Sequence, residues 1–164
     1  EIGRSKVMKV KNGMTLSKKS GPFSIKITDV QVSDLETSKA YKALYDNKDR
    51  LTMVTMAIEV QNTGAGTYSF NPDQGILSTN TKEHTQPNLM ASDRIGGDFI
   101  GKSVQKGYLI FLLDSTSQDI NKISYMIHAG FDDHYNLIGE DIAFEIEFWQ
   151  KKGIGDTITA MVRG

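Results

Sequence analysis

The chain alternates apolar and polar residues in several short runs, which is the period expected of half-buried β-strands. In residues 23–27 the apolar positions are odd-numbered, whereas the next apolar positions are Val30 and Val32. This slip of phase predicts a β-bulge near Asp29. The alternation is clearest in four segments, residues 23–27, 54–60, 123–129 and 142–148.

Other segments depart from simple alternation. Residues 104–114, VQKGYLIFLLD, are apolar in both phases, which predicts a strand at the centre of a sandwich. Residues 33–48 begin with Ser33 and Glu36 at capping-box spacing, which predicts one or two short turns of helix. Residues 67–85 predict two short strands around the turn NPDQG, and residues 86–98 are irregular or briefly helical.

The order of these segments predicts the fold class. About seven strand-like runs are separated by turn residues, and no long helix connects them. Parallel strands need crossovers of about a dozen residues or more, usually helical, so we expect antiparallel pairing. The fold is therefore predicted to be an all-β antiparallel β-sandwich of about seven strands with a short helical insertion.

Composition divides the chain into one domain and two ends. Residues 1–20 are basic, contain Gly and have few large apolar groups, which predicts an N-terminal tether, with a short edge strand at 8–11 as the alternative. Residues 21–150 form the predicted sandwich domain. Residues 151–164 are a C-terminal tail, for which a terminal strand and a disordered end are both open.

Charge and composition exclude several classes of function. Nineteen basic against twenty acidic residues give a formal net charge of −1, so no overall field attracts nucleic acid. The chain has no cysteine, which excludes a disulfide framework, a cysteine-ligated zinc site and a thiol nucleophile. It contains no apolar run long enough to span a bilayer. It begins at EIGRS without Met, and we expect a mature or truncated form whose targeting segment was removed.

Residues 96–103, GGDFIGKS, match the phosphate-binding pattern of a Gly, four free positions and Gly-Lys-Ser. That pattern binds phosphate where a buried strand precedes it and a helix follows, because backbone amides and the helix dipole hold the phosphate oxygens. Here polar residues precede it and the strand-like run of 108–113 follows. We interpret the octapeptide as a turn that enters a strand, with Lys102 solvated, and nucleotide triphosphatase activity is a remote alternative.

The segment FDDHYN at 131–136 is the most metal-like cluster of the sequence. On an extended segment Asp132 and His134 share one face and offer oxygen and nitrogen ligands, while Asp133 points to the other face. The competing interpretation is a solvated loop between the last two strands, because acidic residues are common in turns. No catalytic residue is predicted: the chain lacks a nucleophile-elbow pattern, and three histidines are weak evidence for a catalytic base.

Three segments together resemble a known family: GPFSIKITDVQVS, LTMVTMAIEVQNTG and GKSVQKGYLIFLL. They are similar to the Ig-like extracytoplasmic domains of unknown function in secreted and lipid-anchored proteins of Gram-positive bacteria, a family sometimes labelled after telomeric repeat-binding factor. The resemblance spans residues 21–148, and its most family-like positions are residues 62–64 and the pair Gly101 and Gly107. It implies an Ig-like antiparallel sandwich, export, often an N-terminal lipidated cysteine followed by a tether, and no catalytic residues.

We therefore expect a noncatalytic, extracytoplasmic module of a lipoprotein that binds a protein or a cell-envelope component. We expect no cofactor and no nucleic acid, and we place partner specificity in the insertion at 33–48. A small-ligand or metal-binding domain that uses Asp132 and His134 is the alternative. The membrane is expected to hold the protein through a lipidated N-terminal Cys outside this sequence, helped by five lysines near anionic lipid, Lys6, Lys9, Lys11, Lys18 and Lys19.

Overall fold

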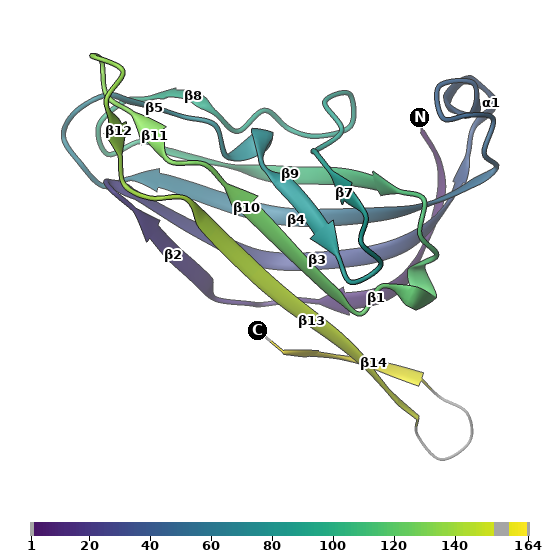
Figure 1. Cartoon of the computed structure of the whole chain (residues 1–164). Helices are drawn as coiled ribbons and strands as arrows, with labels where there is room; N and C mark the ends of the chain where they lie inside the picture. The colour runs from purple at the N-terminus through teal and green to yellow at the C-terminus, as the bar shows by residue number, and fades with distance from the viewer. Residues whose placement is uncertain (1, 153–157, 164) are drawn as a thin grey trace.

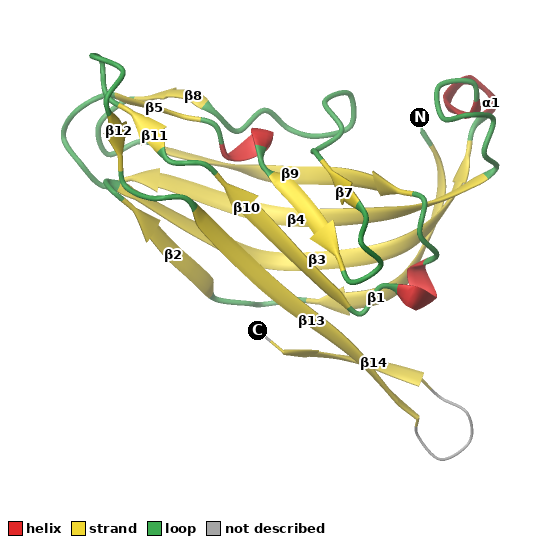
Figure 2. Cartoon of the chain, in the orientation of Figure 1, coloured by secondary structure: helices red, strands yellow, loops and turns green. Residues whose placement is uncertain are grey.

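The computed structural model describes residues 2–152 and 158–163 and shows an all-β protein built from antiparallel sheets (Figures 1 and 2). The back sheet has the order β1-β3-β4-β9, and β2 also pairs with β3. Its strands are β1 (Gly3–Lys11), β2 (Leu16–Ser20), β3 (Phe23–Thr37), β4 (Arg50–Asn62) and β9 (Val104–Leu113).

A front sheet covers one face of the back sheet, and a small end sheet closes one end of the sandwich (Figure 1). The front sheet has the order β14-β13-β10-β6-β7, from β6 (Ile76–Thr79), β7 (His84–Thr85), β10 (Lys122–Ile127), β13 (Ile142–Lys152) and β14 (Ile158–Arg163). The end sheet has the order β12-β11-β5-β8, from β5 (Tyr68–Phe70), β8 (Gly97–Phe99), β11 (Gly130–Phe131) and β12 (Leu137–Ile138).

Three short helical segments connect the described strands, namely α1 (Lys39–Lys42), η1 (Pro72–Gln74) and η2 (Ser117–Asp119). None of the helices in the described part of the chain is long and apolar enough to cross a membrane.

The antiparallel sheets confirm the predicted antiparallel β-sandwich. Fourteen strands are present in the described residues, of which seven are six residues or longer.

The core lies between the back and front sheets and is formed by the inward face of each alternating run. Near the end sheet the rings of Phe23 and Phe70 stack with centroids 4.3 Å apart, and Phe99 meets Phe23 edge-on at 5.3 Å. The bulge predicted near Asp29 is present, because the register of β3 against β4 shifts between Ile27 and Asp29. The faces predicted to be buried in the front sheet are buried, at Ile123, Tyr125, Ile127, Ala129, Ile142, Phe144, Ile146 and Phe148.

Residues 1–20, predicted as a tether, contribute β1 and β2 to the back sheet, and the alternative of an edge strand at 8–11 is confirmed within the longer β1. Lys9 shows why this segment is held: its side chain is 2% exposed, and its ammonium donates to the carbonyl oxygens of Gln118, at 3.4 Å, and Ile120. Burial lowers the pKa of Lys9. The exposed lysines of residues 1–20 suit an edge strand, because their charge discourages pairing with another chain.

Two local predictions also differ from the structure. β3 continues to Thr37, so the helix begins after Ser38, whose hydroxyl accepts from the Tyr41 amide at 3.4 Å, and not after Ser33. β9 lies at the edge of the back sheet and not at its centre. Its second set of apolar residues is half-buried because a loop and the insertion, rather than another strand, lie beside it.

The tail of residues 151–164 forms a terminal strand in its described part. β14 pairs with the end of β13 as a long hairpin (Figure 1). Residues 153–157 and 164 of the predicted tail lie outside the described residues.

Candidate functional site

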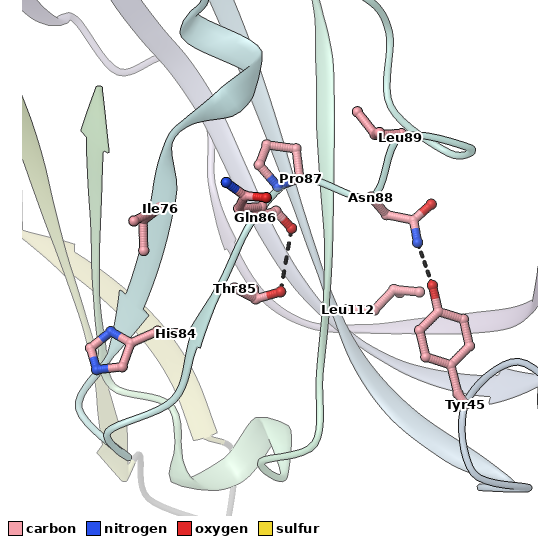
Figure 3. A pocket seen from close by; sticks show the side chains of 9 residues that line it. All are labelled: Tyr45, Ile76, His84, Thr85, Gln86, Pro87, Asn88, Leu89 and Leu112. Carbon is pink, nitrogen blue, oxygen red and sulfur yellow. Dashed lines mark hydrogen bonds between the residues drawn. The ribbon is translucent and has the colours of Figure 1, made fainter. Parts of the chain in front are cut away.

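An open groove of about 650 Å³ lies between the insertion after β3 and the loop after β7 (Figure 3). Tyr45 forms one side, Ile76 and His84 the other, and residues 85–89 run between them, with Leu112 of β9 alongside. The groove thus joins three segments that are distant in sequence. Its position next to the insertion makes it the leading candidate for a binding site.

The insertion holds Tyr45 in place. The ring of Tyr45 stacks on that of the buried Tyr41 with centroids 5.8 Å apart and an interplanar angle of 13°. The amide nitrogen of the Asn88 side chain donates to the Tyr45 hydroxyl across the groove. Burial, with a smaller contribution from Tyr41, raises the pKa of Tyr45, so its hydroxyl is protonated at neutral pH. The stacking on Tyr41 and the hydrogen bond from Asn88 together hold the Tyr45 ring at the side of the groove.

The loop at residues 88–93 carries Asn88 and Leu89 of the groove and is bonded to the free edge of β9. The Asn88 amide donates to the Ile110 carbonyl at 2.7 Å, and the Ile110 amide donates to the Ser92 hydroxyl at 2.8 Å. Two residues earlier in β9, the Tyr108 carbonyl accepts from the Asp93 amide at 2.9 Å, and the Tyr108 amide donates to Asp93 Oδ2 at 2.8 Å. These bonds satisfy the edge strand without another chain.

Two large apolar side chains project from this bonded loop into solvent. Leu89 is 78% exposed and Met90 is 74% exposed. Leu89 also lines the groove, beside the buried Pro87. Neighbouring apolar groups exposed on a fixed backbone are typical of a contact surface.

The groove offers contacts rather than chemistry. His84 is its one imidazole, and the Ser78 hydroxyl lies 2.8 Å from its Nδ1. The nine lining residues include no carboxylate, lysine or arginine.

The metal-like cluster forms a turn, not an extended segment. β11 and β12 pair on either side of it, and Tyr135 within it has a positive φ of 62°. The prediction that Asp133 points away from His134 is wrong, because Asp133 Oδ1 lies 2.8 Å from Nδ1 of His134. One ligand atom from each of Asp132, Asp133 and His134 falls within 4.8 Å of the others. The structure thus brings together the two predicted residues and adds a third.

The carboxylate of Asp132 already accepts several hydrogen bonds. Its Oδ1 accepts from the backbone amides of His134 and Asn136, both at 2.9 Å, and its Oδ2 accepts from the Asn136 side chain at 3.2 Å. The Asn136 amide is the main cause that lowers the pKa of Asp132. These bonds account for the Asp at the first position of the turn without a metal ion.

The octapeptide 96–103 contains β8 and the turn that leads from it into β9, which agrees with the interpretation of a turn that enters a strand. Gly101 packs on the next turn, where an added β-carbon would lie 2.3 Å from the Ala65 carbonyl oxygen. Lys102 is exposed and donates its ammonium to the Thr63 carbonyl. No helix follows the octapeptide, so its amides lack the arrangement that binds phosphate.

The sequence predicted partner specificity in the insertion at 33–48 and did not indicate the loop that brings Leu89 to the groove. The available signal was NLM at 88–90, two large apolar residues in an otherwise polar segment. Their exposure could not be read from a segment without periodicity.

A curated protein of Bacillus subtilis is similar to this chain in sequence. No protein-family model matches the chain. The SPbeta prophage-derived uncharacterized lipoprotein YonS of Bacillus subtilis (strain 168) is 26% identical over 147 residues, which cover 88% of this chain and 66% of YonS. The chain thus spans less than two thirds of the length of this relative. The family resemblance seen in the sequence remains a prediction.

Two solved structures share the fold. A functionally unknown protein from Listeria monocytogenes EGD-e is 15% identical with a TM-score of 0.61, over 76% of this chain and 74% of that protein. The ycdA protein of Bacillus subtilis is 18% identical with a TM-score of 0.54, over 82% of this chain and 39% of that protein. At these identities the likeness concerns the fold alone.

Proposed function

We propose that the chain is a noncatalytic, extracytoplasmic module of a lipoprotein that binds a partner of the cell envelope in the groove of Figure 3. The similarity to YonS, named a lipoprotein, supports the lipoprotein assignment and with it a location at the outer surface of the cell membrane. A lipidated N-terminal cysteine outside this sequence would supply the anchor. The β-sandwich also agrees with the Ig-like extracytoplasmic family that the sequence resembles.

One observation carries the binding role: Leu89 and Met90 are exposed beside an open groove, on a loop whose backbone is bonded to β9. Interfaces are anchored by large apolar and aromatic side chains at their centre and surrounded by polar groups. The groove provides Tyr45 and Leu89 as anchors, with Gln86 and Asn88 as polar neighbours. The exposed aliphatic side chains of Leu89 and Met90 suit a protein surface, and the lining has no Lys or Arg to contact the phosphates of a nucleic acid, so we favour a protein partner.

The test is site-specific photocrosslinking in the cell that produces the protein. A photoreactive residue at Leu89 should give a crosslinked product of one defined mass, and a photoreactive residue at Leu137 should not. Leu137 is the matched control because it is also an exposed leucine, on β12 of the end sheet. The adduct should disappear when Tyr45→Ala is combined with the Leu89 probe. Equal crosslinking from both positions, or none from Leu89, would reject the groove as the binding surface.

A metal-binding function at Asp132 and His134 is the second candidate. The observation in its favour is that three ligand atoms lie within 4.8 Å. Calorimetric titration with zinc and calcium tests it against Asp132→Ala. Zinc binding that the substitution removes would support this site, and an identical titration of both proteins would eliminate it.

A further inference from the structure

A second aspartate, Asp73 in the NPDQG turn, lies in a different environment from Asp132. Its side chain is 9% exposed, and Oδ2 accepts a hydrogen bond from the Ile95 amide at 3.1 Å. Its other oxygen, Oδ1, is buried, and no donor in the described part of the chain reaches it. No described lysine, arginine or histidine forms an ion pair with this carboxylate. A buried carboxylate oxygen without a partner is costly and calls for a specific explanation.

The turn that carries Asp73 is held rigidly, so the carboxylate cannot simply rotate into water. Asp73 and Ile95 exchange two hydrogen bonds: the Asp73 amide donates to the Ile95 carbonyl at 3.1 Å, and the Ile95 amide donates to Asp73 Oδ2 at 3.1 Å. The buried Tyr125 hydroxyl donates to the Pro72 carbonyl at 2.5 Å and accepts from the Gly75 amide at 3.0 Å. Core and backbone therefore fix the position of Oδ1.

A second oxygen converges on the same place. A β-carbon on Gly96 would lie 2.8 Å from Asp73 Oδ1 and 3.2 Å from Asn71 Oδ1. Asn71 does not cap η1 with its side chain; its Oδ1 instead accepts from the Gly97 amide at 3.2 Å. The absence of a side chain on Gly96 thus leaves both oxygens facing one small space. On the other side of Gly96, Gln105 Oε1 accepts a hydrogen bond from the Gly96 amide at 3.0 Å, which holds the backbone of this glycine.

The chemistry of these atoms selects the ligand. Both converging atoms are oxygens, one from a carboxylate and one from an amide, and hard cations such as Ca²⁺ take carboxylate, amide and water oxygens together. A bound cation would also compensate the buried charge of Asp73, which a water molecule would not do. A cavity of about 210 Å³ borders Asp73 and is large enough for the water ligands that would complete the coordination.

We propose that the Asn71–Gly75 turn binds Ca²⁺ through Asp73 Oδ1 and Asn71 Oδ1, with water molecules completing the oxygen set. The site lies beside the binding groove, because Pro87 and Leu89 border both the groove and the Asp73 cavity. Calcium would therefore stabilise the loop that carries the exposed Leu89. Its affinity should resemble that of extracellular modules, with a Kd of about 0.1–1 mM.

Calorimetric titration with CaCl₂ and thermal melting, with and without EDTA, test the proposal on the intact chain. Wild type should bind one Ca²⁺ per chain, and its Tm should rise in about 10 mM CaCl₂. Asp73→Asn should weaken binding at least tenfold. In EDTA the same variant should melt no lower than wild type, because the amide keeps an acceptor for Ile95 and removes the buried charge. Adding calcium should reverse the order of the two Tm values.

Asp132→Asn is the matched control, since it also neutralises an aspartate in a turn but should keep full calcium affinity. Gly96→Ala is a second variant, which retains the charge and places a methyl group between the two oxygens; it too should lose the calcium response. Absence of binding by wild type would overturn the proposal, as would binding that persists in Asp73→Asn. Arg94 borders the same cavity, and an ion pair between Arg94 and Asp73 in solution would likewise overturn the proposal. None of these outcomes depends on whether Leu89 crosslinks to a partner.

Discussion

Two turns of this protein present an aspartate in different ways. Asp132 heads an exposed turn and lies next to another acid and a histidine, yet its carboxylate is satisfied by the amides of its own loop. Asp73 has no acidic or histidine neighbour in sequence, yet one of its oxygens is buried, and none of the described residues donates to it. The comparison shows that clustered ligand residues in a sequence do not by themselves make a site. The unmet hydrogen-bonding capacity of a single group is more informative.

The largest expected difference between the two turns concerns their attachment to the core. Tyr125→Phe removes the hydroxyl that bonds the Pro72 carbonyl and the Gly75 amide, and should lower the free energy of unfolding by about 2–4 kcal/mol because two buried groups lose their partner. Burial raises the pKa of Tyr125, so the hydroxyl is a donor throughout the usual pH range.

Urea unfolding measures this effect, with Tyr135→Phe as the control. Tyr135 lies in the other turn and is 88% exposed, so its substitution should change the unfolding free energy by less than about 0.5 kcal/mol. Similar losses in the two variants would show that the two turns are equally anchored, contrary to the structure.

A smaller, pH-dependent effect is expected at Asp132. Hydrogen bonds from its loop hold the folded-state pKa of this carboxyl below its ordinary value of 3.8. A lowered pKa means that the folded state favours the ionised form. Its contribution to stability is therefore present above about pH 3.8 and is lost as the pH falls through the folded pKa.

Asp132→Ala should accordingly lower Tm modestly at pH 7, and the difference from wild type should shrink below about pH 3.8. Thermal melts at a series of pH values check this. A difference that stays constant down to pH 2 would show that the ionised carboxylate contributes nothing through these bonds.

Much of the fold follows from the sequence, because burial on one face of a strand imposes a period of two. The inward residues of β10 and β13, and the bulge at Asp29, were predictable for this reason. β1 was predictable only in part, as the alternative edge strand at 8–11, because the carbonyls that accept from Lys9 belong to residues more than one hundred positions away. The place of β9 at a sheet edge was hidden likewise, since its covering loop has no periodic pattern.

The candidate sites were less predictable than the fold. The sequence indicated the insertion that carries Tyr45 but not Leu89, whose loop is held beside the groove by its hydrogen bonds to β9. The Asp73 site could not be foreseen from NPDQG, which is an ordinary turn sequence. Its significance depends on Gly96, more than twenty residues later, and on the depth at which Oδ1 is buried.

The most direct test of the comparison is a residue-resolved calcium titration followed by amide NMR spectra of the isotope-labelled protein. The account predicts that CaCl₂ shifts the amide signals of Ile95, Gly96 and Gly97 and those of the Asn71–Gly75 turn, while His134 and Asn136 stay unchanged. Shifts confined to His134 and Asn136 would contradict it and would move the cation to the exposed cluster.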